Sequence, residues 1–136
     1  MIPRYRAWDS AKKEIFKDTF AITESGQVVV VEQESVASSP DYVFVDHLVI
    51  MQSTGLKDKN GKEIFEGDIV RQVRTQPITE NETITGVVIM IEGAWLIMND
   101  CEQLASYLWS ETDENEIIGN VYENPELLEV NHDTIR

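Results

Sequence analysis

The stretch Met51–Val70 (MQSTGLKDKNGKEIFEGDIV) constrains the fold more than any other part of the sequence, because turn signals are densest there. Asn60 and Gly61 both tolerate a positive φ, which a two-residue hairpin turn of the primed type requires at its two central positions. Gly55 and the triplet Glu66–Asp68 supply two further places where the backbone can reverse. The stretch therefore predicts three short strands that fold on each other, over His47–Gln52, Lys62–Phe65 and Ile69–Val73.

Short β-type segments separated by glycine turns continue through the rest of the 136 residues. Four consecutive valines, Val28–Val31, favour a strand because β-branched side chains fit a pleated surface. Gly86 predicts a bulge or bend in the strand region 83–91, and Glu92-Gly93 predicts a hairpin after it. A short helix is considered over Cys101–Trp109, where Leu104 and Leu108 have helical spacing, although the aromatic residues there also suit a strand. The pattern predicts an all-β sandwich or small barrel.

The domain organisation expected is one compact unit with an internal linker. Residues 1–34 are expected to form an N-terminal β-hairpin layer, and residues 35–41 (SVASSPD) a linker of small residues and one proline. Residues 42–130 are expected to form the β-barrel core with one or two helical turns. One of these turns is predicted to start at Pro125. Residues 131–136 are expected to be a tail.

The charge is strongly acidic and unevenly distributed. Lysine and arginine number 11 against 25 acidic residues, for a net charge of −14. Residues 1–74 have a net charge of −2, whereas residues 75–136 have a net charge of −12 and contain a single basic residue, Arg136. Such a field repels nucleic-acid phosphates and attracts basic surfaces, although excess carboxylate also simply keeps a small protein soluble.

A cytoplasmic location is expected. The longest apolar run spans about five residues, far fewer than the ~20 that cross a bilayer, so no membrane association is expected. The N-terminal residues lack the apolar segment of a secretory signal. A single cysteine, Cys101, is consistent with a reducing compartment.

Three segments resemble the YopX family, small proteins of tailed phages and prophages. They are Arg4–Asp9 (RYRAWD), Gln52–Val70, in which TGLKDKNGKEIFEGDIV matches closely, and Ile117–Leu128 (IIGNVYENPELL). The resemblance implies a mainly β fold with an SH3-like barrel at its core, encoded by a phage or prophage and acting in the host bacterial cytoplasm. It implies no activity.

The candidate interaction or structural residues lie in the last two of these segments. In Gln52–Val70, polar side chains are expected to bond their own turns, because Asp and Asn commonly do so. In Ile117–Leu128, polar residues after the last strand can serve either an interaction or a backbone-bonded turn that holds this strand on the central hairpin, and both interpretations stay open. The candidates are Gly55, Asp58, Asn60, Gly61, Glu66, Gly67, Asp68, Asn120, Tyr122, Glu123, Asn124 and Pro125.

No catalytic, metal or cofactor site is predicted. The acidic loop lacks the spacing of a calcium-binding hand, and the sequence contains no phosphate-binding loop, dinucleotide fingerprint or zinc spacing. His47, His132 and Cys101 lie in no nucleophile motif. The aromatic residues Trp8, Trp95 and Trp109, with Tyr5, Tyr107 and Tyr122, suit either a core or a ligand face.

The first functional hypothesis is a non-enzymatic phage or prophage accessory protein whose acidic half binds a host or phage protein with a basic surface. The second is a nucleic-acid mimic that inhibits a host DNA-binding protein, which requires the carboxylates of Glu80 to Glu129 to project from one face. The third is an enzyme or binder acting on nucleotides or phosphates through the basic residues of 4–17 and 57–74. A homo-oligomer through exposed strand edges is compatible with each.

Overall fold

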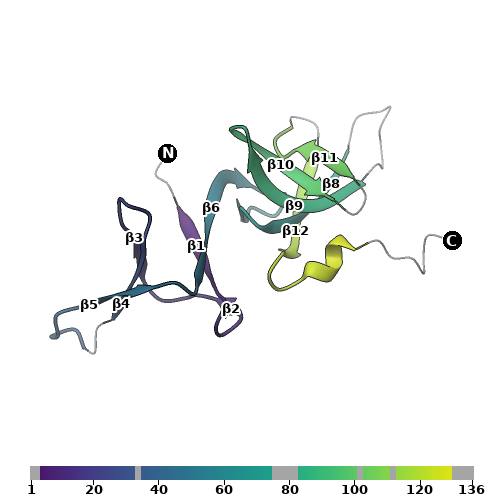
Figure 1. The fold of residues 1–136 in the computed structure, drawn as a ribbon. Coiled ribbons are helices and arrows are strands. Elements are labelled where there is room, and N and C mark those ends of the chain that lie inside the picture. The colour runs from purple at the N-terminus through teal and green to yellow at the C-terminus, as the bar shows by residue number, and fades with distance from the viewer. Residues whose placement is uncertain (1–3, 33–34, 75–82, 101–102, 111–112, 130–136) are drawn as a thin grey trace. The chain divides into compact units, whose positions relative to one another are not determined.

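A computed structural model describes residues 4–32, 35–74, 83–100, 103–110 and 113–129. The fold is mainly β, as the sequence predicts, with twelve strands and one 3-10 turn among these residues (Figure 1). The chain divides into two compact units: a small unit of residues 6–50 and a large unit of residues 1–5 and 51–136. Strands β1 (Tyr5–Asp9) and β6 (Leu48–Lys57) each contribute residues to both units.

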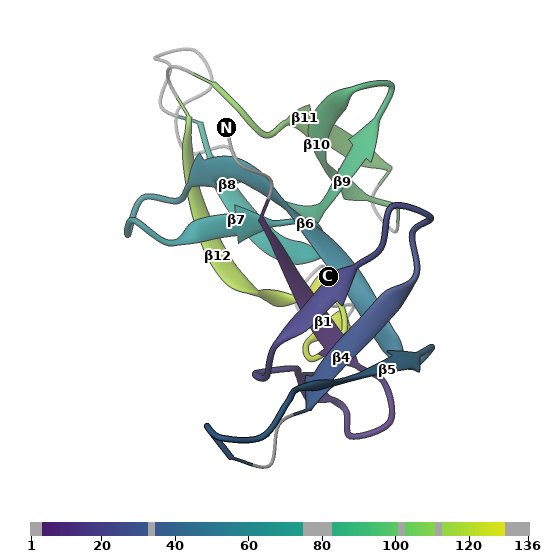
Figure 2. The ribbon, with the colours of Figure 1, turned by 90° about the vertical axis from the view of Figure 1, so that its left-hand side faces the viewer.

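The small unit contains a β-hairpin and a three-stranded antiparallel sheet (Figure 2). Strand β1 pairs with β2 (Glu14–Ile15), so that Trp8 lies opposite Ile15. The sheet has the order β3 (Phe20–Ile22), β4 (Val28–Glu32), β5 (Asp41–Val45). Residues 35–40 of the predicted linker lie between β4 and β5 of this sheet, and its last residue, Asp41, begins β5. The division between the units falls at Ile50 and Met51.

A curled, half-barrel sheet with the order β11-β10-β9-β8-β12 forms most of the large unit (Figure 1). Its core contains Ile64, Val70, Val88, Ile97 and Leu108, all fully buried. The β6–β7 hairpin, which is the turn-rich stretch of the sequence, contributes Ile64 to this core. The remaining elements are β7 (Glu63–Phe65), β8 (Asp68–Val73), β9 (Thr83–Ile91), β10 (Ala94–Asn99), β11 (Leu104–Tyr107), β12 (Glu114–Asn120) and the 3-10 turn η1 (Pro125–Leu128).

Two turns differ from each other in a way that the sequence does not reveal. Glu92 and Gly93 both have a positive φ, of 51° and 81°, and they form the two-residue primed turn between β9 and β10. The Asn60-Gly61 turn does not have this form, because only Gly61 has a positive φ. Instead, the Gly61 N–H donates to the Asp58 carbonyl and the Asp58 N–H donates to the Lys62 carbonyl. The prediction of a primed turn at Asn60-Gly61 is therefore wrong.

Two other expectations are corrected by strand pairing. The helix considered over Cys101–Trp109 is wrong for its described residues, because Leu104–Tyr107 is strand β11, paired with β10. A bulge at Gly86 is also wrong, because the β8–β9 register runs without a shift past this residue. Glycine is required there because an added Cβ would lie 2.6 Å from the Met98 carbonyl oxygen. The register shift lies in β12 instead, between Ile117 and Gly119.

Candidate functional site

Asp58 joins the central hairpin to the last strand of the large unit. Its side chain is 7% exposed. One carboxylate oxygen accepts hydrogen bonds from the N–H groups of Asn60 and Lys62, both at 2.9 Å. The other accepts from the N–H of Ile117, 59 residues away along the chain, at 3.0 Å. One short acidic side chain therefore closes its own turn and holds β12 against it.

The pKa of Asp58 reflects two opposing effects. Burial alone raises the pKa of this carboxyl group, because it disfavours the charged form. The N–H groups of Ile117, Lys62 and Asn60 stabilise the carboxylate more than burial destabilises it. The net pKa is lowered from its ordinary value of 3.8, so Asp58 is ionised at neutral pH.

The predicted residues around Gly67 make a second connection to the same region. The Gly67 N–H donates to the Val88 carbonyl at 2.9 Å, and the Gly67 carbonyl accepts from the Val121 N–H at 2.8 Å. A Cβ on Gly67 would lie 3.2 Å from the Met51 sulfur, and its φ is +88°. Asp68, which is 1% exposed, accepts a hydrogen bond from the Phe65 N–H at 2.8 Å.

The remaining candidates of the central hairpin have local roles. Gly55 has a φ of 79°, and its N–H donates to the Ser53 hydroxyl oxygen at 3.1 Å. One carboxylate oxygen of Glu66 accepts from the Gln52 N–H at 3.3 Å. Both residues therefore stabilise strand β6 where it leads into the hairpin.

The turn after β12 is closed by its own polar side chains. The Asn120 amide oxygen accepts from the N–H groups of Tyr122 and Glu123, and its amide nitrogen donates to the Glu123 carboxylate at 3.0 Å. The Asn124 amide oxygen accepts from the Asn120 N–H at 3.3 Å. Pro125 then begins η1. The structure thus gives the polar side chains of this segment partners in their own turn, while the ring of Tyr122 remains 38% exposed.

A pocket of about 430 Å³ lies beside Asp58 in the large unit. Trp109, with 62% of its surface exposed, lines the pocket, as do Asp113 and Glu114. The other residues that line the pocket are Leu56, Lys57, Asp58, Lys59, Leu108, Ser110 and Asn115.

Two hydrogen-bonded groups position the walls of this pocket. Lys59 donates its backbone N–H to the Asn115 carbonyl at 2.8 Å, and its ammonium group lies 3.8 Å from Glu116. The Asn115 amide group connects the buried Gln72 to the Leu108 carbonyl, with distances of 3.0 and 2.8 Å. Asp58 anchors the hairpin wall as described above. We call the cluster of Trp109, Asp113 and Glu114 the Trp109 patch.

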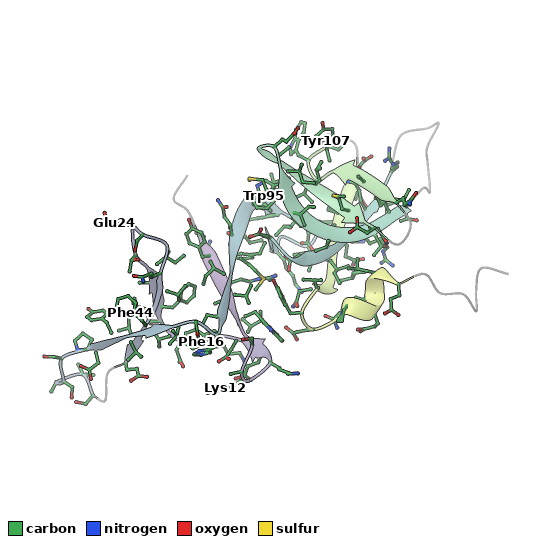
Figure 3. All side chains as sticks on the ribbon, in the orientation of Figure 1. Lys12, Phe16, Glu24, Phe44, Trp95 and Tyr107 are labelled. Carbon is green, nitrogen blue, oxygen red and sulfur yellow. The ribbon has the colours of Figure 1, made fainter. Side chains whose placement is uncertain are left out.

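The structure separates the tryptophans that the sequence groups together. Trp8 is 7% exposed and belongs to the core of the small unit, and Trp95 packs against the core of the large unit. Trp109 is 62% exposed instead, and Tyr107, two residues before it, is 68% exposed (Figure 3 labels Tyr107). The sequence could not separate them, because no periodicity distinguishes Trp109 from the buried Leu108 beside it.

A second pocket, of about 690 Å³, lies in the small unit. His47 lines it and pairs with Asp9, at 3.9 Å, rather than with its sequence neighbour Asp46. The backbone N–H of Lys12 is the main cause of a lowered pKa for Asp9. Burial opposes it, and the Ala11 N–H and the nearby His47 and Lys12 side chains add smaller lowering effects. His132 and Cys101 lie outside the described residues.

No group of three or more His, Cys, Asp or Glu side chains within the described ranges is arranged to hold a metal ion. In the same ranges, no helix has the length and apolar character needed to span a membrane.

The sequence of residues 4–129 matches the model of a protein family, described as YopX protein. The chain belongs to the YopX family. None of the curated proteins matches the chain. Among solved structures, protein yopX from Bacillus subtilis is similar with a TM-score of 0.63 and 23% identity, over 92% of this chain and 97% of that one. A protein from Enterococcus faecalis has 28% identity and a TM-score of 0.49, over 95% of this chain and 99% of its own.

The resemblance drawn from the three sequence segments is therefore confirmed at the level of the family. The likeness to the Bacillus subtilis structure extends this to the fold. Asp58 and Gly67 show why two of these segments go together, since hydrogen bonds join the central hairpin directly to β12 and the turn that follows it.

Proposed function

We propose that this chain is a non-enzymatic accessory protein of a phage or prophage that binds a basic protein partner in the host cytoplasm. The observation that carries the proposal is the Trp109 patch, an exposed tryptophan that lines one pocket together with two acidic residues on the acidic half of the chain. Between Thr75 and Ile135 the sequence contains no lysine or arginine.

The chemistry of the patch suits an arginine or lysine side chain of a partner. A cation over an exposed tryptophan face gains about 0.5–1 kcal/mol, and nearby carboxylates add to this attraction. The long-range field of the acidic half steers a basic partner towards the patch and raises the association rate more than the affinity. Lys57 lines the same pocket and favours a partner that also carries an acidic group beside its basic one.

A nucleic-acid mimic has less support, because two of the carboxylates it requires are engaged within the chain. Glu116 accepts a hydrogen bond from Arg71 at 2.7 Å and also faces Lys59, and both lower its pKa. Glu123 holds the Asn120 amide. Phosphate chemistry has little support from the basic residues named for it, since Arg4, Lys59 and Arg71 all have carboxylate partners at 3.0, 3.8 and 2.7 Å.

The test is affinity capture from host lysate, with the immobilised chain washed at about 0.05 M and about 0.5 M salt. The expected result is a basic protein that is retained at low salt and released at high salt, because screening weakens attraction between exposed charges. Trp109→Ala is expected to weaken retention of this protein severalfold.

Tyr42→Ala is the matched control, because Tyr42 is also an exposed aromatic residue, at 64%, but lies in the small unit. It is expected to retain the partner as the unmodified chain does. Retention that is equal at both salt concentrations, or equal for Trp109→Ala and Tyr42→Ala, would contradict the proposal.

A further inference from the structure

Strand β5 presents an unusually apolar edge. It is the last strand of the three-stranded sheet, so no described strand lies beyond it. Its central residues Tyr42, Val43 and Phe44 are 64%, 39% and 64% exposed (Figure 3 labels Phe44). The backbone groups on the outer side of such a strand form a template for pairing with another strand.

The features that normally protect an edge strand are missing from β5. Its sequence, DYVFV, contains no lysine and no proline, and its single charge is on Asp41, at the first position. The register with β4 is unbroken from Val28↔Val45 to Glu32↔Asp41, so no bulge turns the edge away. Natural proteins use these devices to prevent edge-to-edge pairing, and their absence is therefore informative.

The side chains of β5 alternate between the two faces of the sheet. Tyr42 and Phe44 share a face because they lie two residues apart. Their partners on β4, Val31 and Val29, lie on that same face. Val43 lies on the opposite face, across from Val30. Both faces of this small sheet are thus apolar at its open edge.

We propose that β5 pairs antiparallel with β5 of a second copy of this chain, about a two-fold axis at Val43. In this register Tyr42 lies opposite Phe44 of the second copy, and Asp41 lies opposite Val45 of the second copy. The four aromatic rings then form one continuous row on a single face, and the two three-stranded sheets become one six-stranded sheet.

A second copy fits this edge because the strand is complementary to itself. The antiparallel arrangement places the two Asp41 carboxylates at opposite ends of the shared ladder, so the only charges in the strand do not meet. A basic partner of the kind proposed above would find a single carboxylate here, whereas an uncharged apolar strand finds a matching surface. The self-pairing rests on β5 alone and does not depend on the proposed partner binding.

The surface available at this edge limits the strength of the dimer. The two rings and Val43 expose roughly 300 Å² per copy, because a buried aromatic residue covers about 150–250 Å² in total. This is below the ~800 Å² per partner of a standard stable interface. The association is therefore weak and depends on concentration, and the net charge of −14 on each copy makes it stronger at higher salt.

Sedimentation velocity on the full chain tests the proposal over about 5 to 500 μM protein. The weight-average mass of the unmodified chain is expected to rise towards about twice the monomer value. Phe44→Lys is expected to remain monomeric throughout. Tyr107→Lys is the matched control, because it places the same charge on another exposed aromatic of an edge strand, and it is expected to dimerise normally. A chain that stays monomeric over the whole range, or a dimer that survives Phe44→Lys, overturns the proposal.

A crosslink tests the register separately. Residues opposite each other in an antiparallel pair have Cα atoms about 4.5–5.5 Å apart, which suits a disulfide. In a Cys101→Ser background, Val43→Cys is expected to form a covalent dimer under mild oxidation. Val49→Cys, equally exposed at 37%, is the control and is expected to stay mainly monomeric. Equal crosslinking of the two variants would overturn the pairing about Val43.

Discussion

Asp58 connects two of the family-matching segments, because it bonds its own turn and the N–H of Ile117. Asp58→Asn keeps the size of the side chain but removes its charge and places an amide N–H against a backbone N–H donor. We expect it to lower the free energy of unfolding by about 2 kcal/mol at pH 7, since hydrogen bonds to a charged group contribute about 1.5–3 kcal/mol. Urea unfolding followed by circular dichroism measures this change.

The effect of Asp58→Asn on the free energy of unfolding is expected to depend on pH. The pKa of Asp58 is lower in the folded chain than its ordinary value of 3.8, so the ionised group stabilises the fold above that value. This stabilisation is lost as the pH falls through the folded pKa. The difference in the free energy of unfolding between Asp58→Asn and the unmodified chain is therefore expected to stay constant from pH 7 to about pH 5 and to shrink at lower pH.

Asp46→Asn serves as the control for this experiment, because Asp46 is exposed. Surface substitutions of this kind usually change stability by less than about 0.5 kcal/mol. A difference for Asp58→Asn that stays constant over the whole pH range would contradict the role assigned to its carboxylate.

At the level of elements, Gly86 allows β10 to approach β9 closely. In Gly86→Ala the new Cβ would lie 2.6 Å from the Met98 carbonyl oxygen and 2.9 Å from Ile97. Because backbone atoms cannot move aside as a flexible side chain does, we expect a loss of about 1–3 kcal/mol in the free energy of unfolding. Thermal denaturation measures it.

Thr85→Ala is the adjacent control on the same strand. It removes atoms rather than adding them. We expect it to lower the free energy of unfolding by no more than ~1 kcal/mol, the span of the β-propensity scale. If Gly86→Ala and Thr85→Ala had the same free energy of unfolding, the close approach of β10 to β9 would not require glycine at position 86.

Local signals predicted the elements well where turn chemistry decided them. The strands expected at 62–65 and 69–73 differ by one residue at most from β7 and β8. The Glu92-Gly93 hairpin was predicted correctly. The Asn60-Gly61 turn was not, because the Asp58 side chain bonds two N–H groups of this turn and only Gly61 takes a positive φ.

Other features of the structure depend on contacts distant in sequence. The strand character of Leu104–Tyr107 comes from pairing with β10, which two leucines at helical spacing do not reveal. The bond from Ile117 to Asp58 spans 59 residues, so no local pattern predicts it. Likewise, the exposure of Trp109 depends on how β11 and β12 are held by Gln72 and Asn115.

At the scale of the whole molecule, the two units differ in the size of their cores. The buried apolar residues of the small unit are Ala7, Trp8, Val29 and Leu48. Among the described residues, the large unit buries twice as many apolar residues, and its half-barrel sheet has five strands against three. Regions with few buried apolar contacts open at lower free energy. We therefore expect the small unit to open locally before the large unit does.

Native-state hydrogen exchange followed by mass spectrometry measures this difference. Peptides covering β3, β4 and β5 are expected to lose protection at lower denaturant than peptides covering β8, β9 and β10. Raising the protein concentration is expected to slow exchange in β5 selectively, because self-pairing protects its outer N–H groups. In Phe44→Lys, exchange in β5 should no longer slow with protein concentration, and the small unit should still open before the large unit. Simultaneous exchange of both units would mean that they unfold as one cooperative body, and the smaller core would then be stabilised by more than its own buried residues.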